Sequence, residues 1–572
     1  MFTVDEVLLK HYPNIANKPL LSKSLTFLLR RLLHEREMHE FATLYPHLRG
    51  LDFVEQVLDY FKISYSVRDV EKEHIPNEGR VVIIANHPIG SLDALALIKL
   101  VSEVRKDIKV IANQLLMALP PLHPLLLPVN NMQGGTAKEH IKSIQQHLEH
   151  EGVVIVFPAG EVSRLRPQGI RDTKWQSGFL RIAKQTKSAI LPVYIDAKNS
   201  TLFYSLSMLY KPLASMLLVT EMFKQQRKHL PIRIGELIPY SSFATSNLAK
   251  KLQVSQFKKH LYKIGNNKPG IFITQKPIAM PENRQELKQA LKRHCQRLGE
   301  TADGKIIYLY QHAESTAILR EIGRLREIAF RAVGEGTNKK RDIDHYDQDY
   351  FQLILWDPEE LEIAGAYRFG DAKNLIAKNG LKGIYSSTLF DYSPAMNKYF
   401  EQGLELGRSF VQPKYWGKRS LDYLWYGIGA FLQHHPQYRY LFGPVSLSNS
   451  YPQAAKELLV NFYTLYFKQS APVATSKHPY LCHLHKEFFS GEDYQQDFSL
   501  LKKLLTNMGV AVPTLYKQYT ETYDEGGVHF IDFNIDPDFN DCIDGLVIGD
   551  ISMLKAKKRA RYMPNAPAVE PQ

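Results

Sequence analysis

The sequence predicts an α/β protein built from two domains. Its 572 residues exceed what one ordinary hydrophobic core organises, so two domains of roughly 250 to 300 residues are expected. Between residues 80 and 195, short β-branched runs alternate with segments of helical periodicity, a pattern typical of a largely parallel sheet. A second strand–helix pattern begins near residue 305, after a polar connector. The contents of 44% hydrophobic and 23% charged residues are those of folded domains.

Each domain has its own set of expected elements. In the first domain, residues 1–275, N-terminal helices precede expected strands at 81–85, 109–112, 153–157 and 190–195 and expected helices at 91–106 and 136–149. Residues 276–304, with Pro277, Pro281 and a polar helix at 282–298, are expected to form a connector. In the second domain, residues 305–572, strands are expected at 305–310, 350–356, 363–369, 383–390, 405–411 and 440–444, helices at 314–332, 417–434 and 451–467, and then a C-terminal extension.

The chain is strongly basic, with a formal net charge of +13. A surplus of this size favours an anionic partner, which could be a membrane surface, nucleic acid or an acidic carrier protein. The sequence contains no zinc-finger spacing, no RNA-binding signature and no basic-leucine heptads, so we do not expect nucleic acid.

The sequence favours a peripheral location on the inner, cytoplasmic face of the cytoplasmic membrane. The first residues are acidic and lack a signal segment, and three widely spaced cysteines suit a reducing compartment. Leucines on one face of residues 20–33 are typical of an interfacial amphipathic helix, with an ordinary surface helix as the alternative. The segment 202–223 is apolar and long enough to span a membrane, but Lys211 and Pro212 lie at its middle. A lysine at that depth is costly, so we expect a membrane-facing or acyl-facing segment rather than a spanning helix.

The first candidate site follows the strand expected at residues 81–85. His87 and Asp93 lie in a Pro/Gly turn that opens a helix, which is where α/β folds place their sites. The carboxylate of Asp93 can accept the Nδ1 proton of the imidazole, which leaves Nε2 as a general base toward an alcohol. Transfer of an acyl group from a thioester to a hydroxyl requires such a base.

A second strand-end loop in the same domain has the composition of a substrate-binding loop. After the strand expected at 153–157 come Gly160, Glu161 and Arg164, which combine a turn, a carboxylate and a guanidinium. We expect these residues to hold the phosphate or polar head of an acceptor.

Three motifs in order resemble the glycerolipid (lysophosphatidate-type) acyltransferase family. They are the box of His87 and Asp93, the Phe157-Pro-x-Gly160 loop and a Pro192-Val-x-Ile strand, and the resemblance covers residues 60–239. Five residues rather than the usual four separate the histidine from the aspartate, and the usual Phe-Pro-Glu-Gly-Thr loop is Phe-Pro-Ala-Gly-Glu. Both departures resemble the branch that acylates lyso-aminolipids such as lyso-ornithine lipid. The resemblance implies a glycerolipid-acyltransferase-like α/β domain.

The second candidate site lies on the strand expected at 405–411. Glu405 and Arg408 stand three residues apart, and the strand runs into a turn before a helix. Such a turn presents backbone N–H groups to a thioester or a pyrophosphate. The layout resembles GNAT-type acyltransferases, which implies a GNAT-like α/β domain. The usual Gln/Arg-x-x-Gly-x-Gly/Ala loop is reduced to Lys414-x-x-Gly417-x-Arg419, which argues against acetyl-CoA.

Further residues upstream strengthen the second site. The segments Leu325-Arg326-Glu-x-x-Phe330, Asp342-x-Asp344-x-Tyr346-Asp347 and Gly365-Ala-Tyr-Arg368-Phe resemble acyl-homoserine-lactone synthases and their relatives that N-acylate ornithine or glycine. The resemblance covers residues 305–467. It implies that Glu405, as a catalytic residue, and Asp347 hold or deprotonate an amino group, and that Asp344 is a substrate-binding residue. It also implies that Arg368 and Arg408 bind a carboxylate or a carbonyl oxygen. Taken singly, each of these residues could form a surface ion pair.

Together the two resemblances imply a bifunctional acyltransferase of ornithine-lipid-like aminolipid synthesis. The second domain would N-acylate an amino acid, and the first would O-acylate the hydroxyl of the resulting lyso-lipid. The expected donor is an acyl thioester on acyl carrier protein or on CoA, with no bound cofactor and no metal. Two alternatives remain. One is a lysophospholipid acyltransferase whose GNAT-like half only binds. The other is a non-enzymatic, membrane-active protein of the kind labelled hemolysin.

Overall fold

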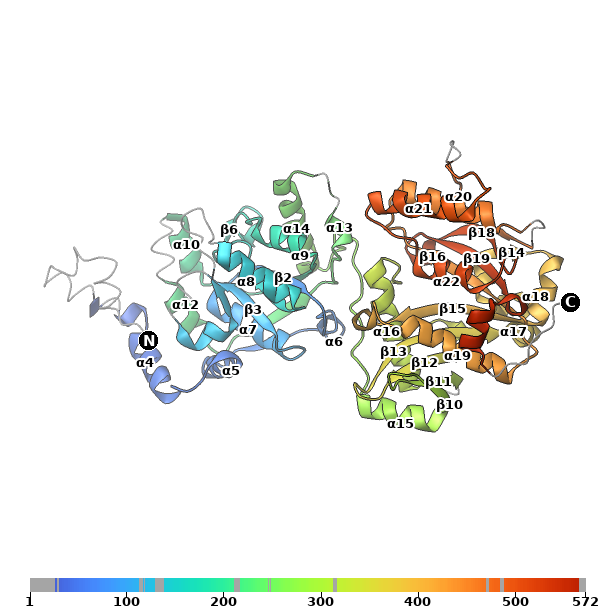
Figure 1. Cartoon of the computed structure of the whole chain (residues 1–572). Coiled ribbons are helices and arrows are strands. Elements are labelled where there is room, and N and C mark those ends of the chain that lie inside the picture. The colour runs from blue at the N-terminus through green and yellow to red at the C-terminus, as the bar shows by residue number, and fades with distance from the viewer. Residues whose placement is uncertain are drawn as a thin grey trace. The chain divides into compact units, whose positions relative to one another are not determined.

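The computed structural model divides the chain into two compact units, Met1–Pro277 and Ile278–Gln572 (Figure 1). It describes residues 26–27, 30–112, 117, 119–128, 138–209, 217–244, 246, 248–311, 316–469, 473–483 and 488–564. Each unit is built on one main sheet. The α/β class and the two-domain organisation are thereby confirmed.

The first unit contains a seven-stranded sheet of order β1-β9-β8-β2-β5-β3-β4. The strands are β1 (Ser64–Ser66), β2 (Val81–Ala85), β3 (Ile108–Ala112), β4 (Leu126–Pro128), β5 (Val153–Val156), β8 (Ala189–Ile195) and β9 (His229–Ile234). Neighbouring strands are parallel except for β8 with β9. A separate hairpin pairs β6 (Arg164–Arg166) with β7 (Gly169–Arg171).

Helices cover both faces of this sheet. They include α4 (Glu35–Leu44), α5 (Gly50–Tyr60), α7 (Ser91–Ser102), α8 (Lys138–Glu149), α9 (Gly178–Thr186), α10 (Thr201–Leu209), α12 (Leu218–Lys224) and α14 (Lys250–Gly265). Val81 and Ile83 of β2 pack with α5 and α7, whereas Val82 and Ile84 pack with α8, α9 and α14. All five residues of β2 are buried, since a strand covered on both faces must be apolar throughout.

The second unit contains an eight-stranded sheet of order β10-β11-β12-β13-β15-β16-β19-β18. The strands are β10 (Cys295–Glu300), β11 (Ile306–Gln311), β12 (Phe351–Asp357), β13 (Glu362–Asp371), β15 (Gly403–Val411), β16 (Tyr440–Leu447), β18 (Val528–Asp536) and β19 (Cys542–Asp550). The helices include α15 (Arg284–His294), α16 (Ala317–Val333), α17 (Ala372–Asn379), α18 (Asn397–Glu401), α19 (Ser420–His434), α20 (Gln453–Phe467), α21 (Tyr494–Asn507), α22 (Thr514–Thr522) and α23 (Ala556–Tyr562).

The pair β15 and β16 is the one parallel pair of this sheet within the described ranges, and it is short. Its register runs only from Gly403 opposite Tyr440 to Glu405 opposite Phe442. Beyond that point β15 continues beside β13, and β16 continues beside β19. The ladder between the two strands therefore ends at Glu405, and the strands part beyond Leu406, whose carbonyl still lies against Gly443.

Three parts of the second half differ from the expected elements. Residues 276–304 are not only a connector, because α15 packs on the second core and β10 is the edge strand of the second sheet. Residues 383–390 are mostly 3₁₀ turns rather than a strand, because this segment folds around the carboxylate of Glu405. Strands β18 and β19 replace part of the expected C-terminal extension.

The expected membrane-facing segments are only partly described. Residues 20–25, 28–29 and 210–216 lie outside the described residues, and with them most of the amphipathic helix expected at 20–33 and the middle of 202–223. Within the described ranges, every helix is too short or too polar to cross a bilayer. The α10 side chains of Leu202 and Met208 are exposed, at 55% and 71%.

Candidate functional site

His87 and Asp93 form a direct pair at the carboxyl end of β2. The Nδ1 atom of His87 lies 2.9 Å from Oδ1 of Asp93. The Asp93 side chain is fully buried, whereas that of His87 remains 19% exposed. The second oxygen of Asp93 accepts hydrogen bonds from the backbone N–H groups of Ile89 and Gly90, at 2.9 and 3.2 Å. These bonds fix Asp93 as an acceptor, so Nδ1 of His87 carries the proton and Nε2 is available as a base.

The backbone around His87 is held from both sides. The side chain of Asn86 exchanges two hydrogen bonds with the backbone of Ile195 at the end of β8, at 2.7 and 2.9 Å. Gly90 precedes α7 with φ of +104° and ψ of −130°, a conformation that is essentially restricted to glycine. The turn therefore delivers His87 to the end of the sheet in one orientation.

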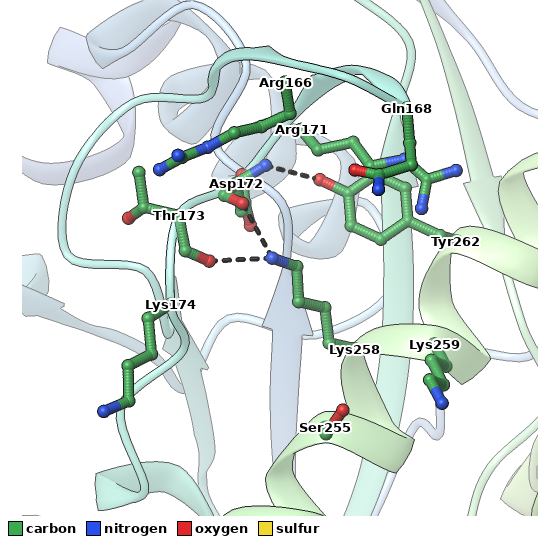
Figure 2. A pocket seen from close by; sticks show the side chains of 10 residues that line it. All are labelled: Arg166, Gln168, Arg171, Asp172, Thr173, Lys174, Ser255, Lys258, Lys259 and Tyr262. Atoms are coloured by element: carbon green, nitrogen blue, oxygen red, sulfur yellow. Dashed lines mark hydrogen bonds between the residues drawn. The ribbon is translucent and has the colours of Figure 1, made fainter.

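Asp172 supports the same turn, although its sequence context did not select it as a site residue. Its Oδ1 accepts hydrogen bonds from the backbone N–H of His87 at 3.2 Å and from the hydroxyl of Ser163 at 2.6 Å. Its Oδ2 accepts one from the indole of Trp175 at 2.8 Å, and its own N–H donates to the hydroxyl of Tyr262 (Figure 2). An aspartate in a polar loop carries no sequence signal of this role, because its partners come from distant segments.

Two carboxylates favour the protonated form of His87. Burial alone would lower the pKa of His87, but the attraction of Asp93 and Asp172 outweighs burial and raises it above the usual value. Burial raises the pKa of Asp172 in turn. The imidazolium that forms when His87 accepts a proton is therefore stabilised by its surroundings.

The predicted substrate loop lies next to this pair. Ser163, which lies between Glu161 and Arg164 in the sequence, donates its backbone N–H to the carbonyl of His87 at 2.7 Å. Gly160 has φ of +67°, and Arg164 lies 3.7 Å from Glu161. The guanidinium of Arg164 also donates to the hydroxyl of Ser207 on α10 at 2.6 Å. The structure thus brings the loop against His87, and Arg164 joins it to α10.

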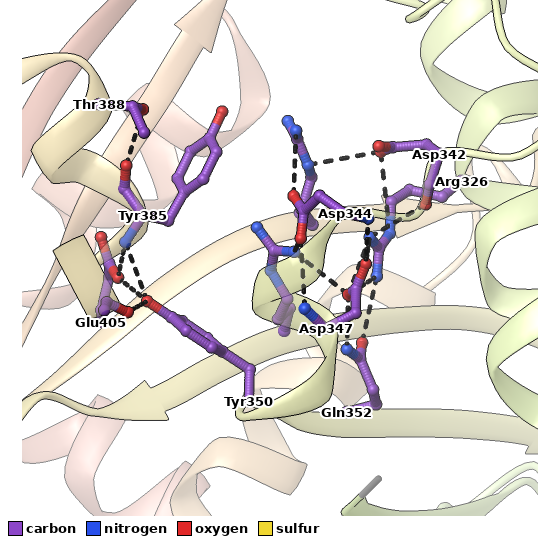
Figure 3. A network of polar contacts seen from close by, with 12 residues as sticks. Arg326, Asp342, Asp344, Asp347, Tyr350, Gln352, Tyr385, Thr388 and Glu405 are labelled. Atoms are coloured by element: carbon purple, nitrogen blue, oxygen red, sulfur yellow. Dashed lines mark hydrogen bonds and ion pairs between the residues drawn. The ribbon is translucent and has the colours of Figure 1, made fainter. Parts of the chain in front are cut away.

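Except for Glu405, the charged residues predicted for the second domain form one network (Figure 3). Arg326 donates to Asp347 at 3.1 Å, and Arg368 donates to Asp344 at 2.6 Å and lies 3.2 Å from Asp347. Burial would raise the pKa of Asp347, but the two guanidinium groups outweigh it and lower that pKa. Gln352 completes the set with a 2.9 Å hydrogen bond to Asp347. Asp347 is therefore ionised and fixes the arginines in place.

The two predicted arginines retain unused hydrogen-bonding capacity. Nε and Nη2 of Arg368 and Nε of Arg408 are buried without a hydrogen-bond partner among the described residues. Arg408 nevertheless lies within 3.4 Å of Asp342 and 3.7 Å of Asp344. Both guanidinium groups stack on the ring of Tyr385, with distances of 5.2 and 4.9 Å. Buried N–H groups in this condition suit a bound carboxylate or carbonyl oxygen.

Glu405 lies on the other side of the Tyr385 segment and is enclosed by donors (Figure 3). The hydroxyl of Tyr350 and the backbone N–H of Tyr385 donate to one oxygen, and the backbone and hydroxyl of Ser386 donate to the other. Burial raises the pKa of Glu405, and these hydrogen bonds oppose the shift. Glu405 therefore holds the turn formed by Tyr385 and Ser386 in place. The ring of Tyr385 in turn stacks against the guanidinium groups of Arg368 and Arg408.

A second acidic group, absent from the sequence predictions, lies near Arg408. Glu335 accepts a 2.9 Å hydrogen bond from Ser446 on β16, and Ser446 stands opposite Asp544 on β19. Burial raises the pKa of Glu335 to about 7 and that of Asp544 well above its usual value, while Arg408 opposes both shifts. In the sequence, a single aspartate within an apolar run, such as Asp544 in β19, could have indicated this acidic group. The strands β18 and β19 were not predicted from the sequence, so the aspartate was not selected.

Two family models match the chain. The model described as "Acyltransferase" matches residues 6–268, and the model described as "Acetyltransferase (GNAT) domain" matches residues 325–426. The first match contains His87 and Asp93, and the second contains the Asp344, Asp347 and Arg408 network.

Each of three curated relatives matches a part of the chain. A glycine N(alpha)-acyltransferase of Bacteroides thetaiotaomicron is 33% identical over 258 residues, which cover 42% of this chain and 77% of the relative. A lyso-glycine lipid O-acyltransferase of the same organism is 32% identical over 225 residues, covering 38% of this chain and 82% of the relative. An L-ornithine N(alpha)-acyltransferase of Agrobacterium fabrum is 32% identical over 117 residues, covering 19% and 39%.

Proposed function

The chain belongs to the acyltransferases and carries both an acyltransferase domain and a GNAT domain, and we propose that it makes a diacylated amino-acid lipid in two steps. The second unit would N-acylate an amino acid with a 3-hydroxyacyl chain. The first unit would then O-acylate the 3-hydroxyl of that product. The pairing of His87 with Asp93 at 2.9 Å carries the proposal for the second step.

In the O-acyl step, His87 acts as a general base. Its Nε2 takes the proton of the acceptor hydroxyl while the hydroxyl oxygen attacks the thioester carbonyl carbon. The C–S bond then breaks, and the protonated His87 returns the proton to the departing thiolate. Asp93 keeps the proton on Nδ1 and stabilises the imidazolium that forms. Gly160, Glu161 and Arg164 place the polar head of the acceptor.

In the N-acyl step, the buried network holds the amino acid beside the splayed strands. The unpartnered Nε and Nη2 of Arg368 would bind its carboxylate or the thioester oxygen, and Arg408, whose Nε lies 3.4 Å from Asp342, would add positive charge beside them. Asp344, Asp347 and Glu405 would set the negative potential that retains the amino group. One carboxylate of this set takes a proton from the ammonium group, and the amine then attacks the thioester carbonyl carbon. The C–S bond breaks, and the second proton of the nitrogen passes to the departing thiolate.

We take glycine as the first candidate for the amino acid. Similarity to the glycine N-acyltransferase spans 77% of that relative, whereas similarity to the ornithine N-acyltransferase spans 39%. Ornithine, which the sequence motifs favoured, is the second candidate. The buried carboxylates of Glu335 and Asp544 near Arg408 could receive its additional ammonium group.

The thioester donor is proposed to be acyl carrier protein or CoA, and the site of action the membrane surface. The net charge of +13 supports attraction to an acidic carrier and to anionic lipid. The exposed apolar side chains on α10 support contact with acyl chains or lipid.

The proposal is tested with the purified full chain, a 3-hydroxyacyl donor and either glycine or ornithine, with products identified by mass spectrometry. His87→Ala should accumulate the N-acylated lyso-lipid. Arg408→Lys should form no lyso-lipid but should still O-acylate supplied N-(3-hydroxyacyl)glycine. The proposal would be refuted if the chain acylated lysophosphatidate but neither the amino acid nor its N-acylated product. It would also be refuted if His87→Ala O-acylated the lyso-lipid as fast as wild type.

A further inference from the structure

A basic pocket lies in the first unit, beside the segment that holds His87 (Figure 2). Its volume is about 350 Å³, large enough for a substantial part of a small ligand. It is formed by the β6–β7 hairpin, the segment that follows it and α14. The lining residues are Arg166, Gln168, Arg171, Asp172, Thr173, Lys174, Ser255, Lys258, Lys259 and Tyr262.

The pocket carries a large excess of positive charge. Five of its side chains are cationic, and its one acid is Asp172. The carboxylate of Asp172 is buried and turned toward His87, Ser163 and Trp175, which occupy both its oxygens. Among the described residues, no carboxylate forms an ion pair with Arg166 or Lys259. Arg166 and Lys259 are therefore not neutralised by an ion pair within the described part of the protein.

Two of the cations are held in place by the fold. Lys258 donates to the backbone carbonyls of Asp172 and Thr173, both at 2.7 Å. The guanidinium of Arg171 stacks over the ring of Tyr262 at 4.9 Å. Burial lowers the pKa of Lys258, the charge of Asp172 opposes this shift, and repulsion from Arg166 and Arg171 adds to it. Holding several positive charges this close together costs free energy, because the charges lose hydration and repel one another. A fold that does so indicates a site preorganised for an anion.

The chemistry of the proposed reaction narrows the choice of anion. The acceptor of the O-acyl step, an N-acylated amino acid such as glycine, carries one carboxylate and no phosphate. The other participant is the thioester donor, whose pantetheine arm ends in a diphosphate in CoA and in a single phosphodiester on a carrier protein. Phosphate oxygens are suited to several arginine and lysine side chains at once.

We propose that this pocket binds the phosphate of the phosphopantetheine arm that carries the acyl donor of the first unit. The inference rests on the proposed O-acyltransferase function and adds the site of its donor. The backbone carbonyl of Asp172 faces the pocket, and its side chain accepts the N–H of His87. Asp172 therefore contacts both the pocket that would hold the phosphate and the backbone of His87, and it is the positioning residue between them.

The experiment measures hydrogen exchange of the full chain with and without CoA, and with apo or holo acyl carrier protein. Phosphate binding should protect backbone amides within residues 164–174 and 250–262. The variant Arg166→Gln/Lys259→Gln, which changes two exposed side chains, should weaken this protection so that half-saturation needs roughly tenfold more probe. The control Lys142→Gln/Arg181→Gln removes two exposed charges from α8 and α9 and should behave as wild type.

The probes separate the sources of phosphate. Protection by CoA assigns the site to CoA donors, and protection by the holo but not the apo carrier protein assigns it to carrier-bound donors. Equal protection by the apo and holo carrier protein, or protection by none of the three probes, would overturn the proposal.

A kinetic readout adds an independent check. In O-acyl transfer to supplied lyso-lipid, the pocket variant should raise KM for the donor and leave KM for the acceptor unchanged. A rise confined to the acceptor would also overturn the proposal. If the chain binds phosphate here but transfers no acyl group to a lyso-lipid hydroxyl, then the proposed function fails and the anion site stands.

Discussion

At the scale of single residues, the two candidate sites differ in how their charged groups are satisfied. In the first unit, Asp93 accepts two backbone hydrogen bonds and pairs with His87, whose Nε2 makes no hydrogen bond to the described residues. In the second unit, Glu405 is enclosed by donors, and it is the arginines that keep unused N–H groups. The reactive capacity therefore lies on a histidine in one site and on guanidinium groups in the other.

The role of Asp93 is tested by Asp93→Asn. Because the Asn oxygen can retain the hydrogen bonds from Ile89 and Gly90, its amide group would face Nδ1 of His87 and donate to it. The proton of the imidazole then moves to Nε2, and the base is lost. We expect O-acyl transfer to fall by roughly 10²- to 10⁴-fold, with N-acyl transfer unchanged.

The pH dependence of O-acyl transfer tests the effect of the Asp93 charge on His87. Neutral His87 is the active form, so kcat/KM of the wild type should rise with pH through a pKa above the ordinary histidine value. Without the Asp93 charge, burial lowers this pKa, and the acid limb of residual activity in Asp93→Asn should shift to lower pH. An unshifted limb would contradict the assignment of Asp93.

At the scale of elements, the separation of β15 from β16 positions the second site. Gly403 to Glu405 pair with β16, and Arg408 lies beyond the point where the strands part. Arg408 has φ of +51°, and the β13–β15 register shifts between Ala366 and Arg368. The bulge and the splay together turn Arg408 toward the network.

Gly443 makes the close approach before the splay possible. A Cβ at this position would lie 2.0 Å from the carbonyl oxygen of Leu406 on β15. We expect Gly443→Ala to destabilise the second unit by about 1 to 3 kcal/mol and to reduce N-acyl transfer, because the backbones must move apart. Urea unfolding and the N-acyl assay measure both effects.

Gly407→Ala is the matched control for stability, since a Cβ added at this position on β15 would meet no described atom within 4 Å. Its free energy of unfolding should stay within about 0.5 kcal/mol of wild type. Equal unfolding curves for the two glycine variants would contradict the packing argument.

At the scale of the whole molecule, the chain is an enzyme made of two units with separate cores. The non-enzymatic alternative is therefore excluded. The boundary at Pro277 and Ile278 assigns α15 and β10 to the second unit. Leu287 and Leu291 of α15 are each 1% exposed and pack with Tyr310.

Two fragments test this boundary. The fragment 278–572 should fold and retain N-acyl transfer, whereas 305–572 should lose on the order of 5 kcal/mol of stability through the loss of two buried leucines and an edge strand. Circular dichroism with urea and the N-acyl assay compare them. Equal stability of the fragments would show that α15 and β10 are dispensable.

The sequence by itself determined the α/β class, the two domains and the His87–Asp93 pair. Buried parallel strands are continuous apolar runs, and this pair lies six residues apart on one turn, so both signals are local. It also selected Asp344, Asp347, Arg368 and Arg408, which the structure joins in one network.

Only the tertiary structure decided which distant groups complete each site. Asp172 reaches His87 across 85 residues, and Glu335 reaches Ser446 across 111, so neither contact leaves a pattern in sequence spacing. The 385–386 turn depends on the buried carboxylate of Glu405, and the basic pocket depends on α14 lying against the β6–β7 hairpin. Local periodicity of the sequence determines the helices and strands, whereas long-range packing determines which groups their charged side chains contact.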